Sequence, residues 1–310
     1  MNVVIVTSNG INWANQSVYY LVEELNVKAI FYRLPNSNNF FNFEKKLEKN
    51  SYFLEKTYSE KAFIKGFNSF NNDFFRNFLK ENTIDYVLVL GTSNIFDKKT
   101  LEGSAKFINF HLTLLPKYRG PSFLLPIING DKESGVTIHK LTEVIDSGDI
   151  YIQESFILED RDTQKSLLYK LADTALKCTY SLVEKIMQDE LNKIYILGLE
   201  DLKTAYQGKH DDSFFELNIY NDDLNTIDRK VRAYGEDGLI YFILNNKKIY
   251  VKKSNFIKTS YLEYRKIIVA DDDSLLINEN NRGLMLSFLY YKESIEETSL
   301  LSKLLISNYL

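Results

Sequence analysis

The sequence predicts an α/β protein with a doubly wound sheet, followed by a smaller β-rich C-terminal domain. Two patterns support this prediction. Through about residue 190, short apolar runs alternate with amphipathic stretches, as strands and helices do in a largely parallel sheet. Beyond about residue 205, apolar runs follow one another with few helical stretches between them. We therefore expect one domain over residues 1–204 and a second over 205–310, which 310 residues can support.

Apolar periodicity indicates the elements of the first domain. Val18, Leu21, Val22 and Leu25 recur at helical spacing and define the first helix. Strands are expected where apolar residues cluster in short runs, over residues 2–7, 27–34, 62–65, 86–91, 107–111, 135–141 and 150–156. Helices are expected over residues 16–25, 41–56, 73–80 and 162–189.

The second domain is expected to be a small barrel rich in β-strands. Residues 238–251 read as a hairpin that turns at Asn245 and Asn246, because asparagine tolerates the left-handed backbone of tight turns. Further strands are expected over residues 265–270, 275–278 and 284–290. Few helices separate these runs, which is typical of a barrel.

Composition excludes several classes of protein. A net charge of -4 gives no general basic field for nucleic acid. The chain begins directly with an apolar strand and has no long apolar span, so we expect neither export nor membrane insertion. A single cysteine, Cys178, fits a reducing cytoplasm. With only three histidines beside it, no zinc-type cluster and no metal are expected.

Three side chains suggest acyl-transfer chemistry. Asn109 and His111 lie two apart on the expected strand 107–111 and therefore share a face. Asp146 follows on a separate loop, where a carboxylate can orient His111 and favour its charged form. An amide donates to the oxyanion of a tetrahedral intermediate, and an imidazole exchanges protons near neutral pH. His139, on the next strand, fits a position facing this site or a purely structural one about equally well.

These residues belong to a longer pattern. It runs Asn109-Phe110-His111, Thr113-Leu114-Leu115-Pro116, Tyr118-Arg119-Gly120, Gly135-Val136-Thr137 and Asp146-Ser147-Gly148. In this order and spacing it resembles the signature of the formyltransferase family that uses 10-formyltetrahydrofolate. The resemblance implies a Rossmann-like catalytic domain, 10-formyltetrahydrofolate as cosubstrate, and catalytic roles for Asn109, His111 and Asp146. Thr113 stands where that family usually has serine, which keeps the hydroxyl group.

The resemblance also suggests ligand contacts. In the family, backbone groups after the strand that precedes the Asn-x-His strand hold the pterin ring, which here points to Gly91, Asn94 and Phe96. Val144, two residues before Asp146, is assigned to the same cofactor site. The first loop contains Asn9 and Trp13 and is similar to the first loop of some bacterial sugar N-formyltransferases. Amides and a helix N-terminus there could bind a diphosphate.

The acceptor is the most open question. Length, charge and the first loop favour a nucleotide-linked amino deoxysugar, with the product entering a surface glycan such as the lipopolysaccharide O-antigen. Methionyl-tRNA formyltransferase is an alternative of similar length, although tRNA binding favours a basic surface. Formyltetrahydrofolate hydrolase is a further alternative, but its family carries an extra domain before the first strand. We expect no nucleic-acid partner, and the apolar tail 295–310 leaves a homodimer open.

Overall fold

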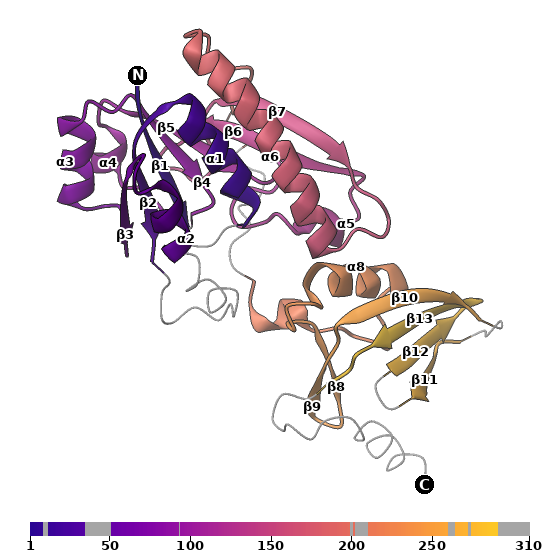
Figure 1. The fold of residues 1–310 in the computed structure, drawn as a ribbon. Coiled ribbons are helices and arrows are strands. Elements are labelled where there is room, and N and C mark those ends of the chain that lie inside the picture. Colours follow the sequence, from indigo (N-terminus) through magenta and orange to yellow (C-terminus); the bar gives the residue numbers. More distant parts are fainter. Residues whose placement is uncertain are drawn as a thin grey trace. The chain divides into compact units, whose positions relative to one another are not determined.

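The computed structural model describes residues 1–8, 12–34, 51–92, 94–198, 201, 210–259, 264–271 and 274–290 (Figure 1). The chain forms two compact units. The first comprises Met1–Phe123, Glu133–Ile157 and Leu168–Gly208, and the second comprises Leu124–Lys132, Leu158–Leu167 and Lys209–Leu310. The boundary expected after residue 204 falls outside the described residues. Two segments that precede this boundary pack with the second unit.

A seven-stranded sheet with the order β3-β2-β1-β4-β5-β6-β7 forms the centre of the first unit. The strands are β1 (Asn2–Ser8), β2 (Asn26–Arg33), β3 (Phe63–Phe67), β4 (Tyr86–Leu90), β5 (Lys106–His111), β6 (Glu133–Lys140) and β7 (Ile150–Ile157). The first five pair in parallel, which confirms the doubly wound arrangement. β6 and β7 instead pair antiparallel, so the sheet is mixed. The short link between β6 and β7 suits antiparallel neighbours, because parallel neighbours need a long crossover.

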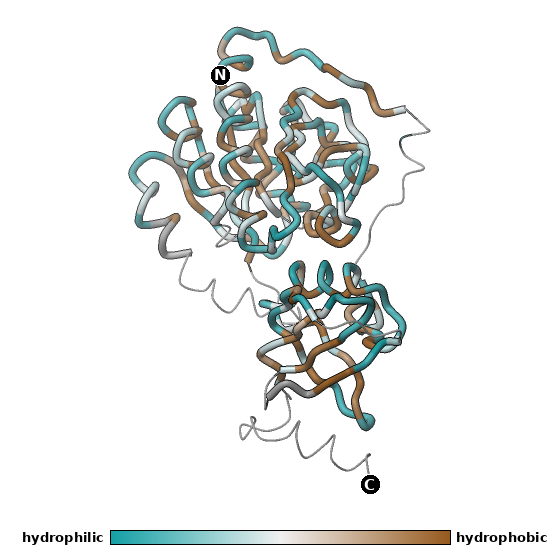
Figure 2. The backbone as a smooth tube through the Cα atoms, turned by 90° about the vertical axis from the view of Figure 1, so that its right-hand side faces the viewer, coloured by the Kyte–Doolittle hydropathy of each residue, from teal (hydrophilic) through white to brown (hydrophobic). Residues whose placement is uncertain are grey.

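Helices cover the sheet. They are α1 (Asn15–Glu24), α2 (Ser51–Tyr58), α3 (Asp73–Glu81), α4 (Lys98–Leu101) and α6 (Gln164–Met187), with a 3-10 turn, η1, at Asn12–Ala14. α1 and α6 lie side by side, and the rings of Tyr20 and Tyr180 are 4.5 Å apart (Figure 1). The helix expected over 41–56 lies largely outside the described residues, and α2 begins at Ser51. Hydrophobic and hydrophilic residues alternate along the helices of this unit, as expected for helices with one buried face (Figure 2).

An aromatic core fixes α3 against the sheet. Phe75 is fully buried and contacts Phe31 and Phe70, with ring centroids 5.4 and 5.6 Å apart. The helix begins at a cap where the Asn72 side chain accepts a hydrogen bond from the Phe75 amide at 2.9 Å. Burial of each such ring contributes about 1.5–3 kcal/mol. The core therefore holds the strands whose ends carry the site described below.

The second unit is rich in strands, as predicted. Its sheet has the order β10-β13-β12-β11, and β8 and β9 form a separate hairpin. The elements are α5 (Leu125–Asn129), η3 (Asp212–Phe215), α8 (Leu224–Tyr234), β8 (Tyr241–Leu244), β9 (Lys247–Tyr250), β10 (Lys253–Lys258), β11 (Lys266–Asp271), β12 (Ser274–Glu279) and β13 (Arg282–Ser287). The hairpin turns at Asn245 and Asn246, which have φ of 49° and 60°, the left-handed backbone expected there. α8 and β10 were not predicted.

The sequence also led to expectations about a dimer contact and about membrane insertion. The tail 295–310, considered as a dimer contact, lies outside the described residues. Among the described helices, none combines the length and the apolar character needed to cross a lipid bilayer.

Candidate active site

β5 carries two of the predicted catalytic side chains. Asn109 and His111 lie two residues apart at its carboxyl end, so they share one face. Asn109 is half-buried and His111 is buried. β5 pairs in parallel with β4, and ligands in such sheets bind beyond the carboxyl ends of the parallel strands. β5 thus presents an amide and an imidazole at the edge where a substrate is expected.

Asp146 reaches the same place from the loop between β6 and β7. Its Oδ2 lies 3.5 Å from His111 Nδ1, and its Oδ1 lies 3.4 Å from His139 Nε2. Asp146 and both imidazoles are buried. The structure therefore brings Asn109, His111 and Asp146 together and adds His139 to the group.

Backbone contacts hold the Asp146 loop in place. Asp146 has φ of 48°, a left-handed conformation that aspartate tolerates better than most residues. The Gly120 amide donates to Asp146 Oδ2 at 2.7 Å. The buried Arg119 guanidinium donates twice, at 3.0 and 2.6 Å, to the carbonyl oxygen just before Asp146. A Cβ at Gly148 would overlap the Lys140 carbonyl, so the loop requires glycine there.

The carbonyl oxygen of Tyr118 determines how His111 is protonated. It accepts hydrogen bonds from His111 Nε2 at 2.9 Å, Thr113 Oγ1 at 3.1 Å and Ser122 Oγ at 2.5 Å. Because a carbonyl oxygen only accepts, these partners assign the hydrogen to Nε2. In the neutral imidazole, the lone pair then lies on Nδ1, the nitrogen that faces Asp146. His111 is oriented as a proton acceptor.

His139 orients the amide of Asn109. The two residues lie opposite each other on β6 and β5, and His139 is fully buried. His139 Nδ1 lies 2.9 Å from the Lys140 carbonyl oxygen, which assigns its hydrogen to Nδ1. Its Nε2 accepts from Asn109 Nδ2 at 3.1 Å. An amide has two N–H bonds, so the second remains for a substrate oxygen.

Burial governs the charge of His111. It lowers the pKa of His111, and the neighbouring Asp146 carboxylate opposes this shift without cancelling it. Asp146 thus favours the charged form of His111, as expected, but burial has the larger effect and lowers the pKa overall. For Asp146, burial acts to raise the pKa, but His111, His139 and the Gly120 amide together outweigh it and lower the pKa. The site thus holds a neutral imidazole beside an ionised carboxylate at neutral pH.

The predicted cofactor residues after β4 lie in a turn that leads back into the core. Gly91 has φ of 72°, and its carbonyl accepts from Ser8 Oγ at 2.6 Å. The Asn94 Oδ1 accepts from the Phe70 amide at 3.3 Å, whereas its Nδ2 is buried with no partner among the described residues. The Phe96 ring is 4% exposed and packs in the aromatic core. Only the main chain of Phe96 is therefore left for a cofactor.

The remaining predicted ligand residues differ in how far the structure describes them. Val144 is 53% exposed, and its carbonyl accepts from the hydroxyls of Thr142 and Ser147 at 2.9 and 2.8 Å. Trp13 is half-buried in η1, just before α1. Asn9 lies outside the described residues.

Sequence reasoning assigned no task to Arg119 and left that of His139 undecided. Both are buried polar residues next to the catalytic motif, and a buried charge requires a partner. That partner comes from the distant loop at Asp146, which no local pattern reveals. Within the described residues, no group of three or more His, Cys, Asp or Glu side chains is placed to hold a metal ion.

Comparisons with known proteins place this arrangement in context. Residues 1–183 match the formyl transferase family. A methionyl-tRNA formyltransferase from Buchnera aphidicola is 28% identical over 225 residues, which cover 71% of this chain and 70% of the relative.

Solved structures agree with the fold. An N-formyltransferase from Helicobacter canadensis, in complex with folinic acid and dTDP-3-aminofucose, superposes with a TM-score of 0.60 at 18% identity, covering 93% of this chain and 99% of that one. HypX from Aquifex aeolicus superposes with a TM-score of 0.62 at 13% identity; 98% of this chain is covered, but only 47% of HypX. This chain thus spans about half the length of HypX. Since the family match covers more than half of the 310 residues, the chain belongs to the formyl transferase family and is a formyltransferase.

Proposed function

We propose that this formyltransferase moves the formyl group of 10-formyltetrahydrofolate to the amine of a nucleotide-linked amino deoxysugar, for a surface glycan such as the lipopolysaccharide O-antigen. The likeness to the Helicobacter canadensis N-formyltransferase carries the choice of acceptor, because it extends over 93% of this chain and includes both units. That protein was solved with a folate and a dTDP-linked amino sugar. A net charge of -4 also suits a small anionic substrate better than tRNA.

In the proposed mechanism, the acceptor amine attacks the formyl carbon and a tetrahedral oxyanion forms. The second N–H of Asn109 donates to this oxyanion, while the first stays bonded to His139 Nε2. His111 Nδ1 takes the proton that the amine loses, because it carries the lone pair of the neutral imidazole while Nε2–H is held by the Tyr118 carbonyl.

Asp146 stabilises the imidazolium that forms in this step. Its Oδ2 lies 3.5 Å from Nδ1, where the new proton arrives. Collapse of the intermediate breaks the bond from carbon to the folate nitrogen, which leaves with a proton. The products are a formamido sugar and tetrahydrofolate, and the imidazole returns to its neutral form.

The folate would bind at the edge of the sheet beyond β4 and β5. In this proposal, main-chain groups of Gly91, Asn94 and Phe96 and the exposed Val144 contact the pterin ring. Asn9 and Trp13 of the first loop contact the nucleotide-linked acceptor, where the positive end of the dipole of α1 suits a diphosphate.

Methionyl-tRNA is the second candidate acceptor. One observation favours it: relatives that cover about 70% of this chain at 28% identity are methionyl-tRNA formyltransferases. An acidic chain can still bind tRNA through a local basic surface, so only an assay separates the two.

The test supplies 10-formyltetrahydrofolate with each acceptor in turn: dTDP-, UDP- and GDP-linked amino sugars, methionyl-tRNA, and buffer alone. We expect one nucleotide amino sugar to gain a formyl group by mass spectrometry, and the Asn109→Ala variant to lose that product. Formylation of methionyl-tRNA at a comparable rate would move the proposal to translation initiation. Consumption of 10-formyltetrahydrofolate in buffer alone would make the protein a hydrolase.

A further inference from the structure

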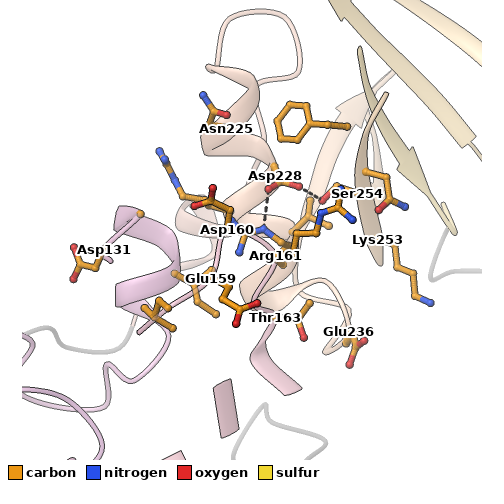
Figure 3. A pocket seen from close by; sticks show the side chains of 18 of the residues that line it. Asp131, Glu159, Asp160, Arg161, Thr163, Asn225, Asp228, Glu236, Lys253 and Ser254 are labelled. Carbon is orange, nitrogen blue, oxygen red and sulfur yellow. Dashed lines mark hydrogen bonds and ion pairs between the residues drawn. The ribbon is translucent and has the colours of Figure 1, made fainter. Parts of the chain in front are cut away.

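The second unit contains a cavity that is separate from the residues discussed above. Its volume is about 700 Å³, and its walls come from the end of α5, residues 158–163, α8 and β10. All the residues that line it belong to the second unit. Figure 3 shows Asp228 and Ser254 near the middle of this cavity, and Asp131 and Glu236 at its edges.

The cavity contains more positive charge than its own carboxylates neutralise. Two cations are paired: Arg232 with Asp228 at 2.8 Å, and Lys132 with Asp160 at 3.1 Å. Five more cations line the walls, and none of them forms an ion pair with a carboxylate within the described part of the chain: Arg161, Arg229, Lys252, Lys253 and Arg282.

Two of these cations are held by neutral partners. Arg282 donates to Asn225 Oδ1 at 2.7 Å, and its guanidinium carbon lies 4.0 Å from the centroid of the Phe256 ring. These contacts fix the orientation of the guanidinium plane but leave its charge uncompensated. A fixed guanidinium with spare donors is the group that proteins use to bind phosphate in a bidentate manner.

Arg229 is held in the same way. It donates to Thr226 Oγ1 at 3.2 Å, while its Nε is buried and has no partner among the described residues. A Cβ at Gly130 would lie 2.9 Å from its NH1, so the glycine that ends α5 leaves room for this guanidinium.

From these contacts we propose that the cavity binds a small phosphate-bearing molecule that also carries hydroxyl or amino groups. Arg282 and Arg229, with the three other uncompensated cations, contact the phosphates. The volume is in the range of small-molecule sites. Carboxylates in the same walls, such as Glu159 and Glu236, suit hydroxyl or amino donors of the ligand and would repel a continuous nucleic-acid backbone.

The test measures pyrophosphate binding to the full-length chain by calorimetry at about 0.15 M salt. We expect saturable binding that weakens as salt is added. Arg282→Gln should weaken it about tenfold, as expected for loss of one charge-assisted pair. Arg161→Gln, at an exposed position, should also weaken pyrophosphate binding. It replaces Arg282→Gln as the test variant if Arg282→Gln lowers the unfolding temperature.

Lys253 and Lys258 provide a matched pair of variants, because both are exposed lysines of β10 and only Lys253 lines the cavity. Lys253→Gln should weaken pyrophosphate binding, and Lys258→Gln should change it less than twofold. Equal losses in the two variants, or no binding by the wild type, would overturn the proposal.

Two further arms identify the source of the phosphate. Uridine diphosphate that binds more tightly than pyrophosphate, with the same dependence on Arg282, indicates a nucleotide. Equal affinities indicate that the diphosphate group alone is recognised. If tRNA displaces pyrophosphate at far lower concentration, the surface binds RNA and the small-molecule proposal fails. Because binding is measured without formyl transfer, these outcomes do not depend on the proposed acceptor.

Discussion

The two units hold their charged side chains in different surroundings: the Asp146 carboxylate is buried, whereas Arg229 is half-buried and Arg282 is exposed. In the first, the Asp146 carboxylate is buried beside His111 and His139, and the Gly120 amide donates a hydrogen bond to it. In the second, the guanidinium groups of Arg229 and Arg282 are oriented by neutral side chains. A buried carboxylate next to an imidazole stabilises the imidazolium that forms when the ring takes up a proton. Oriented but uncompensated charge leaves attraction available for a ligand.

The largest expected effect comes from removing the Asp146 carboxylate. Asp146→Asn should lower kcat about 10³–10⁴-fold, because the imidazolium loses its stabilising carboxylate. The fold should persist, since the asparagine oxygen still accepts from the Gly120 amide. Kinetics with the best acceptor and circular dichroism measure both. Asp149→Asn, in the same loop, is the control and should stay within about twofold of wild type.

The link between His139 and Asn109 is tested by a double-mutant cycle. Asn109→Ala should cost about 10²–10³ in kcat, as loss of an oxyanion donor does. His139→Leu should cost about tenfold, because the amide loses its orienting acceptor. The double variant should be no worse than Asn109→Ala alone, since both changes remove one unit. Additive losses would show that His139 acts on its own, and His139→Gln should recover part of the activity.

The charge of His111 can be followed by NMR, because the chain has only three histidines. Its titration midpoint should lie below the ordinary value of about 6.5, since burial lowers the pKa. As pH falls through that ordinary value, the unfolded chain binds the proton and the folded one does not, so stability decreases. Asp146→Asn should lower the midpoint further, because it removes the opposing charge. A higher midpoint in that variant would contradict this account.

The smallest expected effect comes from a carboxylate in the cavity wall of the second unit. Glu236→Gln removes an exposed carboxylate from the cavity wall, so pyrophosphate should bind about two- to fivefold more tightly. Calorimetry measures this change. Glu190→Gln, an exposed carboxylate of the first unit, should leave the affinity as it is. Weaker binding in Glu236→Gln would mean that the ligand needs this carboxylate more than it is repelled by it.

Local patterns were sufficient to predict most of the first unit. Strand β5, with Asn109 and His111 on one face, follows from apolar residues around two polar ones. The direction of β6 does not follow, because an apolar run reads the same whichever way the strand lies in the sheet. β10 was missed because its sequence Lys-Ser-Asn-Phe-Ile-Lys is mostly polar and exposed. Strands of this kind depend on the partner with which they pair.

In the candidate site, too, the sequence predicts some residues but not all of their contacts. Asn109 and His111 can be placed from their spacing, whereas their meeting with Asp146 was expected only from the family pattern. The contact of Arg119 with the Asp146 loop depends on the left-handed backbone at Asp146, which cannot be predicted from the sequence. The cavity of the second unit could not be foreseen, because its walls come from segments more than a hundred residues apart.

The carbonyl oxygen of Tyr118 limits how the sequence of the turn after β5 can change among related enzymes. The Tyr118 oxygen that anchors His111 belongs to the peptide backbone, so it is supplied by any residue that tolerates the φ of 58° at this position, which excludes proline and disfavours β-branched residues. Exchange of the tyrosine ring for a side chain that accepts this backbone leaves the lone pair of His111 Nδ1 in the same direction. Insertions or deletions in the turn between β5 and α5 would rotate that oxygen away. Natural diversity here should therefore appear as changes of residue type at constant turn length.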